Sequence, residues 1–233
     1  MLFKRILRLL FPERCRCCGK LLVYPQEALC PACRSEYESA KKRLCAHCKR
    51  PYTECRCRPD EYSGAVAEYA CLFKYRKDLL GGALILSLKR RKDREAAKIL
   101  ALDMAKLLKR RVLAGENTVV TYLPRGRSAV AETGTDQSYV LAKRTAKYAG
   151  MPFMKTLKRR RNTGKEQKEL TKAERVSNAD ASFAFAGDHY KVAGKRVILV
   201  DDITTTGASC AACARILKEN GARDVVVLTP GRA

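Results

Sequence analysis

The sequence predicts an α/β protein in which a doubly wound parallel sheet follows a small cysteine-rich module. Short apolar runs rich in β-branched residues alternate with helical patterns from residue 65 onward, which is typical of a parallel sheet covered on both faces. Nine of the 12 cysteines lie before residue 58, eight of them in close pairs, and Cys17 is left over. Near the C-terminus, one strand pattern ends in two aspartates and a hydroxyl-rich turn that opens a helix. Ligand sites of open α/β sheets lie at such strand ends.

The predicted elements follow one another along the chain. Buried runs predict strands at 65–73, 119–123, 153–157, 183–185, 197–200 and 225–228. Apolar residues at helical spacing predict helices over 78–88, 93–114 and 136–149, and after Ser209 as far as Asn220-Gly221. The basic and apolar segment 1–11 predicts a short amphipathic helix that is too short to span a bilayer. We expect two domains, residues 1–58 and residues 65–233, joined by a linker.

The charge balance favours polyanionic partners. The formal net charge is +24, from 48 basic and 24 acidic residues. The alternative is that this charge is a soluble surface without a ligand. One stretch, 155–175, is crowded with lysine and arginine and lacks periodicity, which predicts a loop. It is either a solvated loop or a lid that closes over phosphates, with candidate contacts Arg159, Arg160, Arg161, Lys165 and Arg175.

The paired cysteines predict two structural zinc sites. Cys-x2-Cys is the spacing at which two thiolates of one tight turn reach the same tetrahedral Zn²⁺. Gly19 fits the turn that such a knuckle needs. Disulfides are the alternative, but clustered pairs followed by a cysteine-poor α/β pattern indicate metal binding in a reducing, cytoplasmic compartment. Pairing in sequence order gives the quartets Cys15, Cys18, Cys30, Cys33 and Cys45, Cys48, Cys55, Cys57, and an interleaved pairing stays open.

The segment 197–209 is the candidate ligand site. Backbone N–H groups at a helix start, together with hydroxyls and small residues, suit a phosphate. Two carboxylates suit a ribose diol or Mg²⁺. A P-loop ATPase is the alternative, but Gly164-Lys165 and Gly194-Lys195 lack the other residues of that motif. The segment resembles the phosphoribosyl-pyrophosphate (PRPP) motif of type I phosphoribosyltransferases. The phosphate-binding candidates are Thr204, Thr205, Thr206, Gly207, Ala208 and Ser209, beside the acid pair Asp201 and Asp202.

Nearly the whole chain resembles the ComF family, in which a zinc module precedes a phosphoribosyltransferase domain. Besides the cysteine pairs and the PRPP-like motif, the similar residues are Leu10-Phe11-Pro12, Leu88-Lys89, Gly134 to Leu141, Thr163, Gln167, Leu170, Glu174-Arg175, Asn178 and Phe183. The family usually has Arg-Gly-Phe-Asn-Gln at 133–137, where this chain has Thr-Gly-Thr-Asp-Gln, and Thr163 to Gln167 is one residue longer than usual. The resemblance implies a role in natural competence and in the uptake or handling of single-stranded DNA, with competence or recombination proteins as further partners.

Two function hypotheses follow. In the first, the chain is a phosphoribosyltransferase: Asp201 and Asp202 hold the ribose and Mg²⁺, and Arg125, Gly126 and Arg127 face the pyrophosphate. In the second, it is a non-catalytic adaptor that binds single-stranded DNA and keeps a regulatory or vestigial sugar-phosphate site. Residues 13–58 contain few apolar residues, so we expect zinc to supply most of their folding free energy. The sheet domain is expected to fold without metal.

Overall fold

The computed structural model describes residues 12–22, 28–62, 64–77, 79–91, 93–111, 115, 117–160 and 181–233. Its main sheet contains β1 (Glu68–Lys74), β2 (Thr118–Tyr122), β5 (Arg196–Val200), β6 (Ile203–Thr204) and β7 (Asp224–Arg232). The strand order is β1-β7-β5-β2, β6 continues beside β7, and every pair is parallel. The predicted parallel sheet is therefore confirmed.

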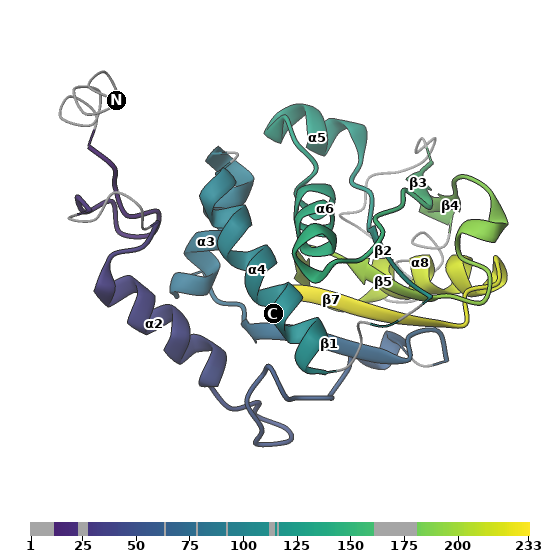
Figure 1. Cartoon of the computed structure of the whole chain (residues 1–233), viewed down its shortest axis with the longest axis horizontal. Helices are drawn as coiled ribbons and strands as arrows, with labels where there is room; N and C mark the ends of the chain where they lie inside the picture. The colour runs from purple at the N-terminus through teal and green to yellow at the C-terminus, as the bar shows by residue number, and fades with distance from the viewer. Residues whose placement is uncertain are drawn as a thin grey trace, which may run out of the picture.

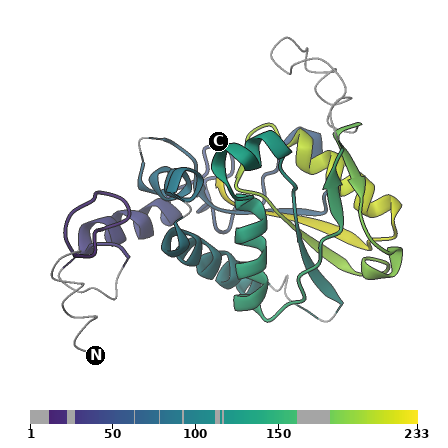
Figure 2. The same cartoon turned by 90° about the horizontal axis from the view of Figure 1, so that it is seen from above.

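Helices cover both faces of this sheet, as Figures 1 and 2 show. The first face carries α3 (Leu80–Arg91), α4 (Arg94–Arg110) and α6 (Gln137–Ala149), and the second carries α8 (Ala208–Glu219). Side chains of a strand alternate between faces, so Ile198 and Val200 of β5 join the first core while Val197 and Leu199 join the second. This two-sided burial explains why the strands read as continuous apolar runs.

The boundaries differ from the predicted ones where local patterns mislead. The predicted strand at 183–185 exists as β4 (Phe183–Phe185), but it pairs antiparallel with β3 (Leu157–Arg159) outside the main sheet. The predicted strand at 153–157 is reduced to an isolated bridge between Phe153 and Val120, followed by β3. The short helices α5 (Arg127–Thr133) and η3 (His189–Lys191) were not predicted, because neither has an apolar stripe long enough to be periodic.

The cysteine-rich segment contributes to both cores instead of standing apart. It contains α2 (Pro31–Lys42), which was not predicted, and the linker after it forms the single turn η1 (Asp60–Tyr62). Tyr37 of α2 packs edge-on against Phe73 of β1, with ring centroids 6.0 Å apart. Cys15 and Cys33 lie in the first core, and Cys45 and Cys55 lie in the second. The cysteine-rich segment and the sheet therefore share both cores, and folding of the sheet domain without metal stays a prediction.

Two sequence predictions concern membranes. Segment 1–11, which is expected to form a short amphipathic helix, lies outside the described residues. In the part of the chain that the structure describes, no helix combines the length and the apolar character needed to cross a bilayer.

Candidate functional site

The eight predicted zinc ligands form two quartets, paired in sequence order. The four sulfur atoms of each quartet lie within 4.8 Å of one another: Cys15, Cys18, Cys30 and Cys33 in the first, and Cys45, Cys48, Cys55 and Cys57 in the second. The Cys18 and Cys30 sulfurs are 3.7 Å apart, and those of Cys48 and Cys55 are 3.5 Å apart. A tetrahedral Zn–S distance of about 2.3 Å places sulfurs about 3.8 Å apart, so both quartets fit zinc.

The two knuckles repeat one hydrogen-bond pattern. In each, the amide of the first cysteine donates to the carbonyl five residues later at 2.8 Å, and its own carbonyl accepts from the amide four residues later at 2.9 Å. The residue four positions on has a positive φ, 73° at Gly19 and 57° at Lys49. Burial opposes ionisation, but nearby backbone N–H groups lower the pKa of Cys15 to about 6 and that of Cys45 to about 7. Both first cysteines are thus prepared to bind metal as thiolates.

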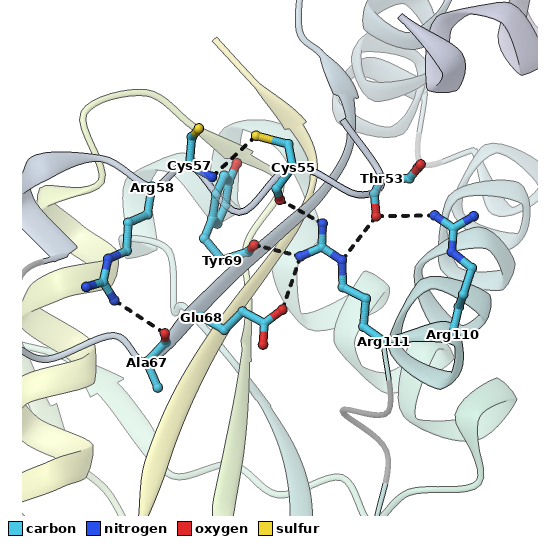
Figure 3. Close-up of polar contacts among 9 residues, drawn as sticks. All are labelled: Thr53, Cys55, Cys57, Arg58, Ala67, Glu68, Tyr69, Arg110 and Arg111. Carbon is cyan, nitrogen blue, oxygen red and sulfur yellow. Dashed lines mark hydrogen bonds and ion pairs between the residues drawn. The ribbon is translucent and has the colours of Figure 1, made fainter. Parts of the chain in front are cut away.

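Arginine side chains hold the second knuckle against the sheet, as Figure 3 shows. The Arg111 guanidinium donates to the carbonyls of Thr53 at 3.0 Å and Cys55 at 2.7 Å on the knuckle side. On the β1 side it donates to the Tyr69 carbonyl at 3.0 Å and the Glu68 carboxylate at 3.2 Å. The side chain of Arg111 is only 8% exposed, so these contacts are shielded from water. Arg111 therefore joins the second zinc ribbon to the first strand.

The acid pair lies where β5 ends. The Asp201 carboxylate accepts from the Ser138 hydroxyl and from the Asp202 amide, both at 2.8 Å, and from the Cys210 thiol at 3.8 Å. Ser138 belongs to the first turn of α6, so Asp201 links two strand-to-helix connections at the carboxyl edge of the sheet. Asp202 is 8% exposed. The sequence predicted these carboxylates as ribose or Mg²⁺ ligands, and their position at this edge suits that role.

The predicted phosphate turn follows the acid pair directly. Gly207 is the N-cap of α8 with φ 92°, and it supplies no side-chain cap. The Ala208 amide donates to the Thr206 hydroxyl at 3.4 Å, and Thr205 and Thr206 are exposed. Thr204 differs from its neighbours, because it is 1% exposed and its hydroxyl lies 3.3 Å from the Tyr62 hydroxyl. The Thr204 side chain therefore supports the turn from beneath, while Thr205 and Thr206 are its exposed part and Ala208 and Ser209 are partly exposed.

The predicted pyrophosphate loop follows the adjacent strand, β2. The Arg125 amide donates to the Asp136 carboxylate at 2.9 Å, and the Arg125 guanidinium contacts the Gln137 side chain. Burial raises the pKa of Asp136, which also caps α6 through the Tyr139 amide. Because β2 and β5 are neighbours in register, this loop and the acid pair share one edge of the sheet.

One predicted lid residue contacts the same loop. The Arg159 side chain passes 3.7 Å from where a Cβ on Gly126 would lie, and its guanidinium stacks 5.2 Å from the centre of the Phe183 ring. Arg160 is exposed, and its amide donates to the Ser182 carbonyl at 2.8 Å. The other three lid candidates, Arg161, Lys165 and Arg175, lie outside the described residues. Arg127, the last residue of the loop prediction, is exposed at the start of α5.

Sequence reasoning missed the residues that hold these parts together. Ser138, Arg111 and Tyr62 contact groups 63, 56 and 142 positions away in the chain, respectively. Ser138 lies in the segment Gly134 to Leu141, so its similarity to the ComF pattern was a usable signal. Arg111 and Tyr62 lie in a helix end and a linker, where neither spacing nor composition marks them.

Comparisons with known proteins agree with this geometry. The double zinc ribbon domain matches residues 6–67, and the phosphoribosyl transferase domain matches residues 135–230. The competence protein ComFC of Bacillus subtilis (strain 168) is 25% identical over 206 residues, which cover 86% of this chain and 82% of that protein.

Solved structures give weaker likenesses. The allosteric regulatory enzyme of purine biosynthesis has a TM-score of 0.39 and 25% identity over 57% of this chain. The glutamine PRPP amidotransferase from B. subtilis has a TM-score of 0.38 and 21% identity, also over 57%. The chain spans only 25% and 26% of those two structures. The two domain matches in this order and the ComFC relative support a ComF-family protein, with a double zinc ribbon before a phosphoribosyltransferase domain.

Proposed function

We propose that the chain binds PRPP or a related phosphorylated ribose, with Mg²⁺, at the carboxyl edge of its sheet. The observation that carries this proposal is the convergence of the acid pair, the α8 N-terminus and the Arg125–Arg127 loop at the ends of two adjacent parallel strands. Backbone N–H groups at Thr205 to Ser209 would hold the 5-phosphate. The carboxylates of Asp201 and Asp202 would accept from the ribose hydroxyls and hold the Mg²⁺, which neutralises phosphate charge when bound.

The same residues suit transfer of a phosphoribosyl group. Arg125 and Arg127 would stabilise the charge that gathers on the leaving pyrophosphate as a nucleophile attacks the anomeric carbon. The chain supplies orientation and charge neutralisation, which suffice when the two reactants are held together. The relative with 86% coverage is a competence protein, so we extend the proposal to a role in natural competence and DNA uptake. Cytoplasmic competence or recombination proteins are the partners that this role requires.

Thermal unfolding tests PRPP binding. We expect PRPP with Mg²⁺ to raise the melting temperature, because a ligand at 100 times its Kd stabilises the folded state by about 2.7 kcal/mol. The double change Asp201→Asn with Asp202→Asn should abolish this shift. Asp224→Asn is the matched control, since Asp224 lies at the start of β7 and pairs with Arg196 at 2.8 Å, at the opposite edge of the sheet. It should lower stability and keep the PRPP shift. No shift in the parent chain at millimolar PRPP would overturn the proposal.

A second candidate function, single-stranded nucleic-acid binding, is favoured by a cluster of rings and cations. Tyr122, Tyr139 and Phe153 pack with ring centroids 5.3 to 6.1 Å apart. The Lys155 and Lys143 ammonium groups lie 5.0 and 5.8 Å from the Tyr139 ring centre. A hollow of about 360 Å³ beside this cluster is lined by a ring, three cations, one carboxylate and four uncharged residues: Tyr139, Arg94, Lys143, Arg144, Asp93, Leu88, Thr135, Gln137 and Val140. Stacking surfaces next to cations are what single strands need.

The salt dependence of binding tests this second candidate. Each phosphate contact with a single strand contributes a slope of about −0.7 to log K against log salt. Changing Lys143 and Arg144 together to Ala should reduce the slope by about 1.4, measured by fluorescence anisotropy with a labelled oligonucleotide. Lys98→Ala is the control, because Lys98 is exposed on α4 and ion-paired with Glu95 at 4.0 Å. A flat salt response of the parent chain would exclude the candidate.

A further inference from the structure

The segment that leaves the second zinc ribbon packs directly under the phosphate turn. A Cβ added to Gly207 would lie 2.5 Å from Cε1 of Tyr62 and 3.2 Å from Cβ of Pro59. At the N-cap of α8, Gly207 has φ 92°, a conformation that L side chains rarely adopt. The backbone of the turn therefore rests on the Tyr62 ring with no space between them. Any change in the position of that ring changes the support of the α8 N-terminus.

Tyr62 also holds the start of the turn. It is 0% exposed, and its hydroxyl lies 3.3 Å from that of Thr204, which is 1% exposed. Burial raises the pKa of the Tyr62 phenol, so its hydroxyl stays protonated and can donate. The ring also packs edge-on against Tyr69 of β1, with centroids 5.6 Å apart. Tyr62 thus connects the first strand with both ends of the segment Thr204 to Gly207.

The chain that leads to Tyr62 begins at the second zinc quartet, at Cys57. Arg232 of β7 donates to the carbonyl of the zinc ligand Cys57 at 3.0 Å. Arg232 is also in register with Thr204, because β6 pairs with the end of β7. From Cys57 to η1 the chain is short, and the Tyr62 amide donates to the Pro59 carbonyl at 3.0 Å. Cys57 and Tyr62 are therefore two anchors of one short segment, and both contact the strand-end structure that forms the turn.

We infer that Tyr62 is a positioning residue for the sugar-phosphate turn, and that zinc in the second quartet holds Tyr62 in place. The identity of the ligand at the turn rests on the proposed function, but the mechanical coupling does not. Without metal, Cys57 loses its bond to zinc, and that end of the segment is held less firmly, by the Arg232 hydrogen bond to the Cys57 carbonyl at 3.0 Å and the Arg58 hydrogen bond to the Val66 carbonyl at 2.6 Å. The ring then leaves Gly207, and the first turn of α8 frays. Phosphate binding is then weakened as well, because it needs the backbone N–H groups of that turn in a fixed array.

Hydrogen exchange of the zinc-loaded full chain tests this coupling without any ligand. Tyr62→Ala should speed exchange of the amides at 203–209 about tenfold or more, because local opening then costs less free energy. Tyr62→Phe keeps the ring on Gly207 and should stay within about threefold of the parent. Tyr37→Ala is the matched control: Tyr37 is 2% exposed and also comes from the cysteine-rich segment, but it packs on Phe73. It should leave the exchange of 203–209 unchanged.

The metal arm of the experiment uses matched ligands of the two quartets. Cys48 and Cys18 are the second cysteines of the two knuckles. Cys48→Ser should speed exchange at 203–209 as Tyr62→Ala does, while Cys18→Ser should not. If a variant fails to fold, the exchange of the amides at 203–209 can be followed during gradual chelation of the parent chain instead. Equal exchange at 203–209 in Tyr62→Ala and the parent, or equal effects of Cys18→Ser and Cys48→Ser, would overturn the inference.

Ligand titration separates this inference from the proposed function. If the parent binds PRPP, Tyr62→Ala should raise the Kd about tenfold, and Tyr62→Phe should have a Kd close to that of the parent. If the parent does not bind PRPP, the proposed function fails while the exchange measurement still decides whether Tyr62 supports the turn.

Discussion

The two zinc ribbons have the same local structure and different surroundings. Both knuckles carry the same pair of backbone hydrogen bonds, and the four sulfurs of each quartet lie within 4.8 Å of one another. The first joins the core on the face of α3, α4 and α6, and the second joins the core on the face of α8. Figure 1 shows the first ribbon projecting beyond α2, while the chain that follows α2 returns to the edge of β1.

The difference in surroundings gives the two ribbons different consequences for the rest of the molecule. The first contacts the N-cap of α4 through Arg16, whose Nε lies 3.8 Å from the Asp93 carboxylate, and this arginine side chain is 42% exposed. The second is held through partly buried contacts with Arg111 and Arg232 and continues into Tyr62. We therefore expect the first metal site to stabilise its own surroundings and the second to support the proposed ligand site as well.

The largest expected effect is the loss of one zinc ligand from each ribbon. We expect Cys48→Ser to lower the melting temperature by about 10 °C, because the second site stabilises the core beneath α8 and shifts of 2–4 °C per kcal/mol are usual at this size. Cys18→Ser should cost less than about half as much. Calorimetry of both variants, with the zinc content of each measured, gives the ratio. A larger effect of Cys18→Ser would reverse the comparison.

Removing the Arg111 guanidinium is the next largest change. Arg111→Ala removes this donor from the Glu68 carboxylate and from the Tyr69 and Cys55 carbonyls, while Arg110 still donates to the Thr53 carbonyl, and the loss should cost about 3 kcal/mol in urea unfolding. Arg110→Ala is the control. Arg110 is an exposed neighbour on α4 that donates to the Thr53 carbonyl at 3.2 Å, and its loss should cost less than about 0.5 kcal/mol. Similar losses in the two variants would show that Arg111 is not the link between ribbon and sheet.

The matched turn positions of the two knuckles give the smallest effect. Gly19→Ala should destabilise the first knuckle by about 1 kcal/mol, since φ there is 73° and a Cβ is disfavoured. Lys49→Gly should stabilise the second by about 0.5 kcal/mol, because its φ of 57° then carries no Cβ. Competition with a chromophoric chelator measures both as changes in zinc affinity. A lower zinc affinity for Gly19→Ala and a higher one for Lys49→Gly would confirm that the two turn positions are equivalent. Changes of the same sign would contradict that equivalence.

The residues that act locally were predictable, and those that act at a distance were not. Cys-x2-Cys and Cys-x-Cys spacing predicted the eight ligands, and the structure groups them in sequence order, the pairing that we expected beside an interleaved one. The order of strand, acids, turn and helix placed Asp201, Asp202 and Gly207 at the edge of the sheet. Helix α2 was not predicted, because its apolar face consists of Cys33, Tyr37 and Ala40, four and three residues apart, and Cys33 is also a predicted metal ligand. The burial of Thr204 could not be predicted, because its partner lies 142 residues earlier.

The domain division is affected by the same long-range contacts. A domain boundary in the linker between residues 58 and 65 remains our prediction. Within the fold, Tyr62 lies in that linker and is among the most deeply buried side chains. Through Tyr62, this linker contributes to the packing beneath the candidate phosphate turn.

The central claim is that the turn after β5 binds a sugar phosphate while Tyr62 supports it from beneath. A crystal structure of the zinc-loaded chain soaked with PRPP and Mg²⁺ tests this most directly. We predict the 5-phosphate on the backbone of Thr205 to Ser209, the ribose beside Asp201 and Asp202, the pyrophosphate facing Arg125, and the Tyr62 ring still in contact with Gly207. A structure with PRPP bound elsewhere, or with the phosphate on this turn after Tyr62 has left Gly207, would contradict the account.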